Sequence, residues 1–299
     1  MIGNNNNILK PRIISSFSYF NTRTNTNVEI PSGLKHILVF GQSRQGKSSI
    51  INMMTGRDKS TGADVSPNVI GCTFSTEPWF NDNYCFWDTA GLNEQDEGKL
   101  SNKDATKNLI QFIRQSKGFH AAIMVVSWNN VNSSVSKQNW NLFYDCFLDQ
   151  RVPIIICITS RGIESCDEDQ QWINDQQEVF KNLGFISKIG KGFKCVVYSK
   201  DLSEIKNQTM KTIYEELRNK SIIYINALLK KNTDDGYYNP LDEMNWFDVF
   251  KKLWNTIMKF FNFMDMMVTV RDAFKHFLIK LGFNHEDAEG ISKETYFDN

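Results

Sequence analysis

The chain of 299 residues is long enough for one α/β domain with an extension and too short for three domains of ordinary size. Lys and Arg together number 34, as do Asp and Glu, so the zero net charge gives no compositional sign of a nucleic-acid partner. The six cysteines are scattered without the paired spacing of a metal site or a disulfide framework, which favours a reducing, cytoplasmic compartment.

Residues 1–33 are rich in Asn and Thr and carry few apolar side chains. Such a segment buries too little apolar surface to offset the entropy lost on ordering. We therefore expect a flexible arm over 1–33.

From Lys35 onward the pattern changes to short apolar runs of strand length, separated by segments with helical spacing. The runs cover residues 36–40, 84–87, 121–126, 152–158 and 193–198, and the helical segments include 105–113 and 172–183. Alternating strands and helices predict a three-layer α/β domain over residues 34–202, with a mostly parallel sheet covered on both faces.

A glycine-rich loop follows the first apolar run and precedes a predicted helix over 48–55. It comprises Gly41, Gln42, Ser43, Arg44, Gln45, Gly46, Lys47 and Ser48, fits the pattern GxxxxGK[ST], and is followed by Ser49. Gly41 and Gly46 let the main-chain N–H groups turn toward phosphate oxygens, and the start of the helix adds its positive dipole end. Lys47 supplies a charge for the β- and γ-phosphates, and the Ser48 hydroxyl is a Mg²⁺ ligand. We predict that residues 41–49 bind the phosphates of a nucleotide.

The second apolar run ends in Asp88-Thr-Ala-Gly91. This sequence places a carboxylate at the carboxyl end of a strand, where ligands bind in open α/β sheets. We predict that Asp88 helps to hold Mg²⁺ and that the Gly91 N–H meets the γ-phosphate.

Over about residues 35–202 the chain resembles P-loop GTPases of the Ras-like and translation-factor class. The resemblance rests on four features in order: a strand, the motif GxxxxGKS, an intervening threonine and DTAG. Within that class, the chain resembles the GIMAP-like (immunity-associated), septin and plastid-import-receptor group. The features that carry this resemblance are the stretch GKSSIINMMTG, the sequence Gly71-Cys72-Thr73 and a helical tail. The resemblance implies GTP or GDP and Mg²⁺ as cofactors. It also implies that Lys47 and Thr73 serve catalysis, with Thr73 as the switch threonine that completes Mg²⁺ coordination. An edge strand over 73–79 is the alternative reading of that threonine.

Two positions depart from the class. Leu92 follows DTAG where a Ras-type enzyme has a glutamine that orients water. The group resembled also lacks this glutamine, which implies slow hydrolysis, stimulated by dimerisation across the nucleotide face. In addition, the strand ending at Thr159 is followed by no aspartate at the spacing that reads guanine.

The resemblance implies that Thr159 and Arg161 line the base pocket and that Glu164 reads the guanine edge. A turn without any base contact is an equally good reading. After the last strand, Tyr198-Ser199-Lys200 is similar to the loop that packs against guanine, so the Ser199 N–H is a candidate contact. A serine that begins a helix accounts for the same residues equally well.

Residues 203–299 read as a helical extension, with one helix over 203–231 and an aromatic, methionine-rich stretch over 246–267. Three surfaces can cover that stretch: the nucleotide-binding domain, a second protomer or a membrane interface. The acidic residues of the stretch argue against anionic lipid, and no apolar run reaches the roughly 18 residues of a membrane span.

The sequence thus predicts a cytoplasmic GTP-binding protein with slow Mg²⁺-dependent hydrolysis, acting as a switch or an assembly protein. Its predicted partners are guanine nucleotide and a second copy of the chain, but not nucleic acid. An ATP-binding P-loop NTPase and a scaffold that does not hydrolyse its nucleotide are the alternatives.

Overall fold

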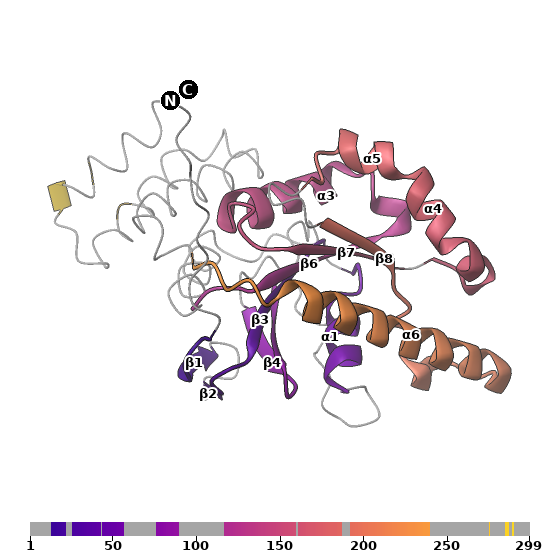
Figure 1. The fold of residues 1–299 in the computed structure, drawn as a ribbon, viewed down its shortest axis with the longest axis horizontal. Helices are drawn as coiled ribbons and strands as arrows, with labels where there is room; N and C mark the ends of the chain where they lie inside the picture. Colours follow the sequence, from indigo (N-terminus) through magenta and orange to yellow (C-terminus); the bar gives the residue numbers. More distant parts are fainter. Residues whose placement is uncertain are drawn as a thin grey trace.

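The computed structural model describes residues 13–21, 26–42, 44–56, 76–89, 117–159, 161–186 and 192–239, together with the single positions 275, 285, 286 and 289. Within these ranges the chain forms a six-stranded sheet covered by helices on both faces (Figure 1).

The sheet has the strand order β4-β5-β3-β6-β7-β8. Its strands are β3 (Lys35–Phe40), β4 (Thr76–Phe80), β5 (Tyr84–Thr89), β6 (Ala121–Ser127), β7 (Ile154–Thr159) and β8 (Gly192–Val196). All neighbours run parallel except β4, which pairs antiparallel with β5 and places Thr76 opposite Thr89. The mostly parallel sheet predicted from the five apolar runs is confirmed.

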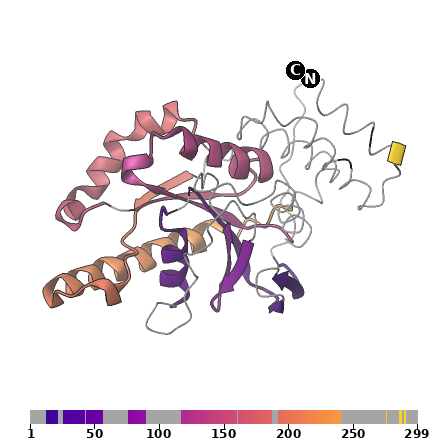
Figure 2. The same ribbon diagram turned by 180° about the vertical axis from the view of Figure 1, so that it is seen from behind.

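Helices α1 (Lys47–Thr55) and α6 (Gln208–Asn232) lie on one face of the sheet, as Figures 1 and 2 show. The other face carries α3 (Ser134–Asn139), a π-helical segment (Trp140–Phe147), α4 (Asp169–Asp175) and α5 (Gln177–Asn182). The predicted helices over 48–55 and 203–231 exist as α1 and α6 with shifted ends. The helix predicted over 172–183 is wrong as a single helix, because the chain turns at Gln176 between α4 and α5. The predicted helix over 105–113 lies outside the described residues.

Side chains of the central strands divide between two cores because successive residues of a strand point to opposite faces. In β3, Leu38 and Phe40 join the core under α3, α4 and α5, whereas Ile37 and Val39 join the core under α1 and α6. All seven residues of β6 are buried. Burial on both faces explains why these strands read as unbroken apolar runs.

A hairpin precedes the sheet. Strands β1 (Phe17–Asn21) and β2 (Thr26–Ile30) pair antiparallel, and Tyr19 and Ile30 are buried. The Tyr19 ring meets Trp87 of β5 edge-on, with 5.0 Å between ring centroids. The flexible arm expected over 1–33 is therefore wrong for these two strands, because their alternating apolar residues find a surface to cover.

His36 lies buried beneath the hairpin, 1% exposed. Its Nδ1 accepts a hydrogen bond from Trp87 Nε1 at 3.3 Å, and its main-chain N–H donates to His120 Nδ1 at 2.9 Å. Burial, helped by the nearby His120, lowers the pKa of His36 from 6.5 to about 3. The imidazole is therefore neutral in the folded protein at ordinary pH.

Helix α6 begins at an Asn207 cap, whose side-chain oxygen accepts from the Met210 N–H at 3.1 Å. Its first half is largely exposed, and its second half buries Ile225, Leu228 and Leu229 against the sheet. No helix in the described ranges combines the length and the apolar character needed to span a membrane. The aromatic stretch over 246–267 lies outside those ranges.

Candidate functional site

The glycine-rich loop leaves the carboxyl end of β3 and enters α1. Gly41 has φ 143°, and a Cβ added there would lie 2.1 Å from the Val125 main-chain oxygen in β6. Gly46 has φ 94° and caps the start of α1. Both positions thus require glycine, as the motif predicts, because other residues would meet a steric clash or an unfavourable backbone angle.

Lys47 and Ser48 occupy the first turn of α1. The Lys47 side chain folds back over the loop, where its Nζ donates to the Gln42 main-chain oxygen at 3.1 Å. Ser48 Oγ donates to Asp88 Oδ2 at 3.0 Å, across 40 residues of sequence. Pairing of β3 with β5, which places Val39 opposite Asp88, brings these groups together.

The Ser48 and Asp88 oxygens fit a Mg²⁺ site. Mg²⁺ prefers oxygen ligands in an octahedron with bonds of about 2.0–2.1 Å, so neighbouring ligand oxygens are about 3 Å apart. The observed separation of 3.0 Å agrees with that spacing. Elsewhere in the described ranges, no group of three or more His, Cys, Asp or Glu side chains could hold a metal ion.

Gln45 fastens the loop to the sheet. Its side chain is buried, and Oε1 accepts from the Ser127 N–H at the end of β6. Its main-chain oxygen accepts from Thr159 Oγ1 at 2.7 Å, at the end of β7. The Gln45 side chain thus points into the protein and its main-chain oxygen is engaged, so the predicted phosphate contact falls to its main-chain N–H. Nothing in the sequence pattern indicated this anchoring role.

Thr159 and Ser199 converge on the same part of the loop. A Cβ added to Gly46 would lie 3.6 Å from Thr159 Cγ2 and 3.8 Å from Ser199 Oγ. The end of β7 and the loop that follows β8 therefore approach the phosphate loop at Gly46. That these residues line a base pocket stays a prediction.

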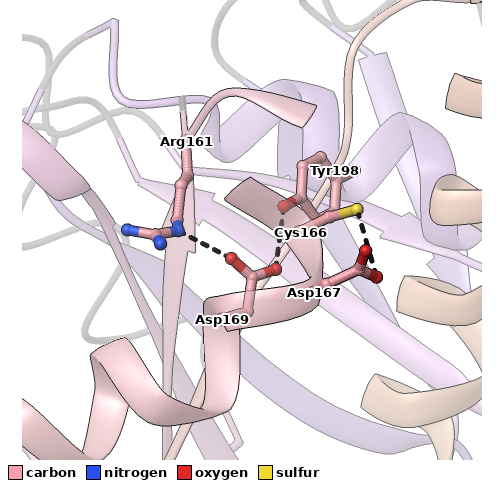
Figure 3. A network of polar contacts seen from close by, with 5 residues as sticks. All are labelled: Arg161, Cys166, Asp167, Asp169 and Tyr198. Carbon is pink, nitrogen blue, oxygen red and sulfur yellow. Dashed lines mark hydrogen bonds and ion pairs between the residues drawn. The ribbon is translucent and has the colours of Figure 1, made fainter. Parts of the chain in front are cut away.

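Arg161 is engaged by α4. Its Nε donates to Asp169 Oδ1 at 2.7 Å, and its guanidinium lies over the Trp172 ring, 5.1 Å from the centroid. Asp169 Oδ2 accepts in turn from the Tyr198 hydroxyl at 2.8 Å (Figure 3). Burial raises the pKa of the Asp169 carboxyl, although the hydrogen bonds from Tyr198 and Arg161 oppose the shift.

The remaining predicted residues are placed as follows. Gln42, Arg44 and Ser49 lie in the loop and the first turn of α1, and the side chains of Arg44 and Ser49 are exposed. Ser43, Thr73, Gly91 and Leu92 lie outside the described residues, as does the side chain of Glu164.

Residues 36–160 match the model of a protein family described as 50S ribosome-binding GTPase. No curated protein matches the chain. Similar solved structures include Era in complex with MgGDPNP and nucleotides 1506–1542 of 16S ribosomal RNA, at 16% identity and a TM-score of 0.39, covering 62% of this chain and 57% of that chain. The G domain of the T. maritima FeoB iron transporter is 18% identical, with a TM-score of 0.32, covering 62% of this chain and 98% of that chain. The bacterial selenocysteine-specific elongation factor EF-Sec is 16% identical, with a TM-score of 0.37, covering 66% of this chain and 29% of that chain.

The chain thus spans less than two thirds of the Era structure that it resembles. The segment that matches this family model contains both the phosphate loop and Asp88. Nearness to the GIMAP-like, septin and plastid-import-receptor group stays a prediction.

Proposed function

We propose that this chain binds GTP or GDP with Mg²⁺ and hydrolyses GTP slowly, as a nucleotide-dependent switch or assembly protein. The observation that carries the proposal is the Ser48–Asp88 hydrogen bond of 3.0 Å beside the phosphate loop, inside the segment that matches a GTPase family. Two sequence-distant oxygens at that spacing, next to a buried lysine, suit a Mg²⁺–phosphate group.

The residues of the loop have separate roles in this proposal. Loop N–H groups and the start of α1 hold the phosphates, and the Lys47 ammonium exchanges the Gln42 oxygen for phosphate oxygens. Ser48 and Asp88 hold Mg²⁺, which neutralises charge on the phosphates when bound. Thr159 and Ser199, which lie beside Gly46 of the phosphate loop, are the proposed contacts of the base.

Slow turnover is proposed from Leu92, whose side chain has no group that could orient a water molecule. Thr73 and Gly91 remain the proposed contacts of Mg²⁺ and the γ-phosphate. A cytoplasmic location, a homodimer across the nucleotide face or through the helical tail, and the lack of a nucleic-acid partner also remain predictions.

Calorimetric titration of nucleotide-stripped protein with a non-hydrolysable GTP analogue and Mg²⁺ tests the proposal. Lys47→Ala is expected to weaken binding at least about tenfold, because it removes the charge that faces the phosphates. Lys181→Ala is the matched control, since its side chain is 66% exposed on α5. Equal affinities for wild type and Lys47→Ala would contradict the phosphate assignment.

An ATP-binding function is the second candidate, and the position of Arg161 favours it. Arg161 follows the base-loop threonine by two residues but is held by Asp169 on α4, and no aspartate follows Thr159 at the guanine-reading spacing. Competition of labelled GTP by unlabelled ATP decides between the two functions. Equal potency of ATP and GTP would overturn the guanine part of the proposal and leave the phosphate and Mg²⁺ parts in place.

A further inference from the structure

We propose that Asp169 is a positioning residue for the nucleotide base, because its carboxylate ties the loop after β7 to the loop after β8. This inference rests on the proposed function, nucleotide binding at the phosphate loop. Asp169 itself belongs to α4 and acts through the two loops that it joins.

Each carboxylate oxygen of Asp169 serves one loop. Oδ1 accepts from Arg161 Nε at 2.7 Å, and Oδ2 accepts from the Tyr198 hydroxyl at 2.8 Å (Figure 3). Arg161 is two residues after Thr159, and Tyr198 immediately precedes Ser199. The two residues that converge on Gly46 are therefore close neighbours of the two residues that Asp169 holds.

Neighbouring groups hold the Arg161–Asp169–Tyr198 contacts in place. The side chains of Arg161 and Asp169 are 9% and 18% exposed, so solvent screens their ion pair little. The Trp172 ring supports the guanidinium at 5.1 Å. On the other loop, the Tyr198 N–H donates to Ser221 Oγ of α6 at 3.1 Å. Loss of the carboxylate would remove one tie from each loop and leave a largely buried arginine without its ion-pair partner.

Base recognition in this chain depends strongly on where the two loops lie. Ligands of open α/β sheets bind at the carboxyl ends of the strands, and both loops begin there. No aspartate stands at the guanine-reading spacing, so in this proposal the base is held by the loops that carry Thr159 and Ser199, the two residues that approach Gly46. Main-chain contacts cannot be adjusted by a change of rotamer, so a shift of either loop is expected to cost affinity directly.

Asp169→Asn tests the inference, because it keeps the side-chain size and removes the charge. Displacement of a fluorescent GDP analogue from the full chain in Mg²⁺ is measured with two competitors. GDP contacts the base loops and the phosphate loop, whereas inorganic tripolyphosphate contacts the phosphate loop alone. We expect GDP binding to weaken about tenfold and tripolyphosphate binding to stay within about twofold of wild type.

Asp149→Asn is the matched control, since Asp149 also accepts from an arginine, Arg151 Nε at 3.3 Å, but lies before β7 at the far end of that strand. Asp149→Asn should leave the affinities for GDP and for tripolyphosphate unchanged. Tyr198→Phe removes only the hydrogen bond from the Tyr198 hydroxyl to Asp169. It should weaken GDP binding less than Asp169→Asn does and leave tripolyphosphate binding unchanged, so it tests the inference even if Asp169→Asn fails to fold.

Equal weakening of both competitors by Asp169→Asn, or no weakening of either, would overturn the positioning role and leave the proposed function standing. A wild-type protein that binds neither GDP nor tripolyphosphate would instead overturn the proposed function, and the inference with it.

Discussion

Replacement of His36 by glutamine should remove a large part of the loss of stability at acid pH. The buried imidazole has a pKa of about 3 in the folded protein, against 6.5 in an unfolded chain. Between these values the unfolded chain binds a proton that the folded protein does not, so the free energy of unfolding falls as pH falls. The contribution of His36 to the free energy of unfolding is therefore undiminished above pH 6.5 and falls as the pH decreases from 6.5 toward 3.

The expected size follows from the shift, since each unit of pKa is worth about 1.4 kcal/mol. From about pH 7.5 to about pH 4.5 the wild type should lose roughly 2 to 3 kcal/mol more than His36→Gln, which stays neutral throughout. Glutamine also keeps an acceptor for Trp87 Nε1, so the comparison isolates the titration of the imidazole.

Urea unfolding followed by tryptophan fluorescence, at a series of pH values, measures this difference. The control is His285→Gln, which alters an exposed histidine and should follow the wild type. Stability curves of wild type and His36→Gln that run parallel across this pH range would refute the reasoning, because a buried neutral histidine must generate a difference.

Three further predictions concern the site. Gly41→Ala should lower the free energy of unfolding by about 3 kcal/mol or more, because the new methyl group would meet a main-chain oxygen at 2.1 Å. Gly184→Ala, at φ 75° in open space, should cost only about 1 kcal/mol, and equal losses in urea unfolding would speak against the steric argument. Thr159→Val should cost about 1 to 2 kcal/mol, since it leaves the buried Gln45 oxygen without its 2.7 Å hydrogen bond, and an unchanged melting temperature would contradict this. Removal of Mg²⁺ by a chelator should weaken GDP binding to the wild type and have much less effect on Ser48→Ala, and identical chelator effects in titration would exclude Ser48 as a ligand.

The sheet could be predicted from the sequence because its strands are buried on both faces. Runs such as 121–126 are apolar without interruption, and an unbroken apolar run of that short length is typical of a fully buried strand. The hairpin over 17–30 escaped prediction for the opposite reason. Its strands show one face to solvent and flank the Asn- and Thr-rich stretch 21–27, so only their alternation separates them from a polar arm.

At the site, the motif predicted that Ser48 and Asp88 serve the same Mg²⁺ ion, and their side chains do meet, because the phosphate loop and the end of β5 lie at the same sheet edge. The role of Asp169 could not be predicted. Its two partners lie 8 residues before it and 29 residues after it, and no fixed spacing connects an acidic residue of a helix to two loops. Long-range side-chain contacts of this kind depend on how the layers pack.

The pairing of β4 with β5 has a mechanical consequence. Thr76 begins β4, Thr89 ends β5, and the two are opposite each other in the ladder. The chain reaches Thr76 three residues after Thr73 and leaves Thr89 two residues before Gly91. The ladder of main-chain hydrogen bonds thus couples the first residue of β4 to the last residue of β5, so a displacement of one strand end is transmitted to the other.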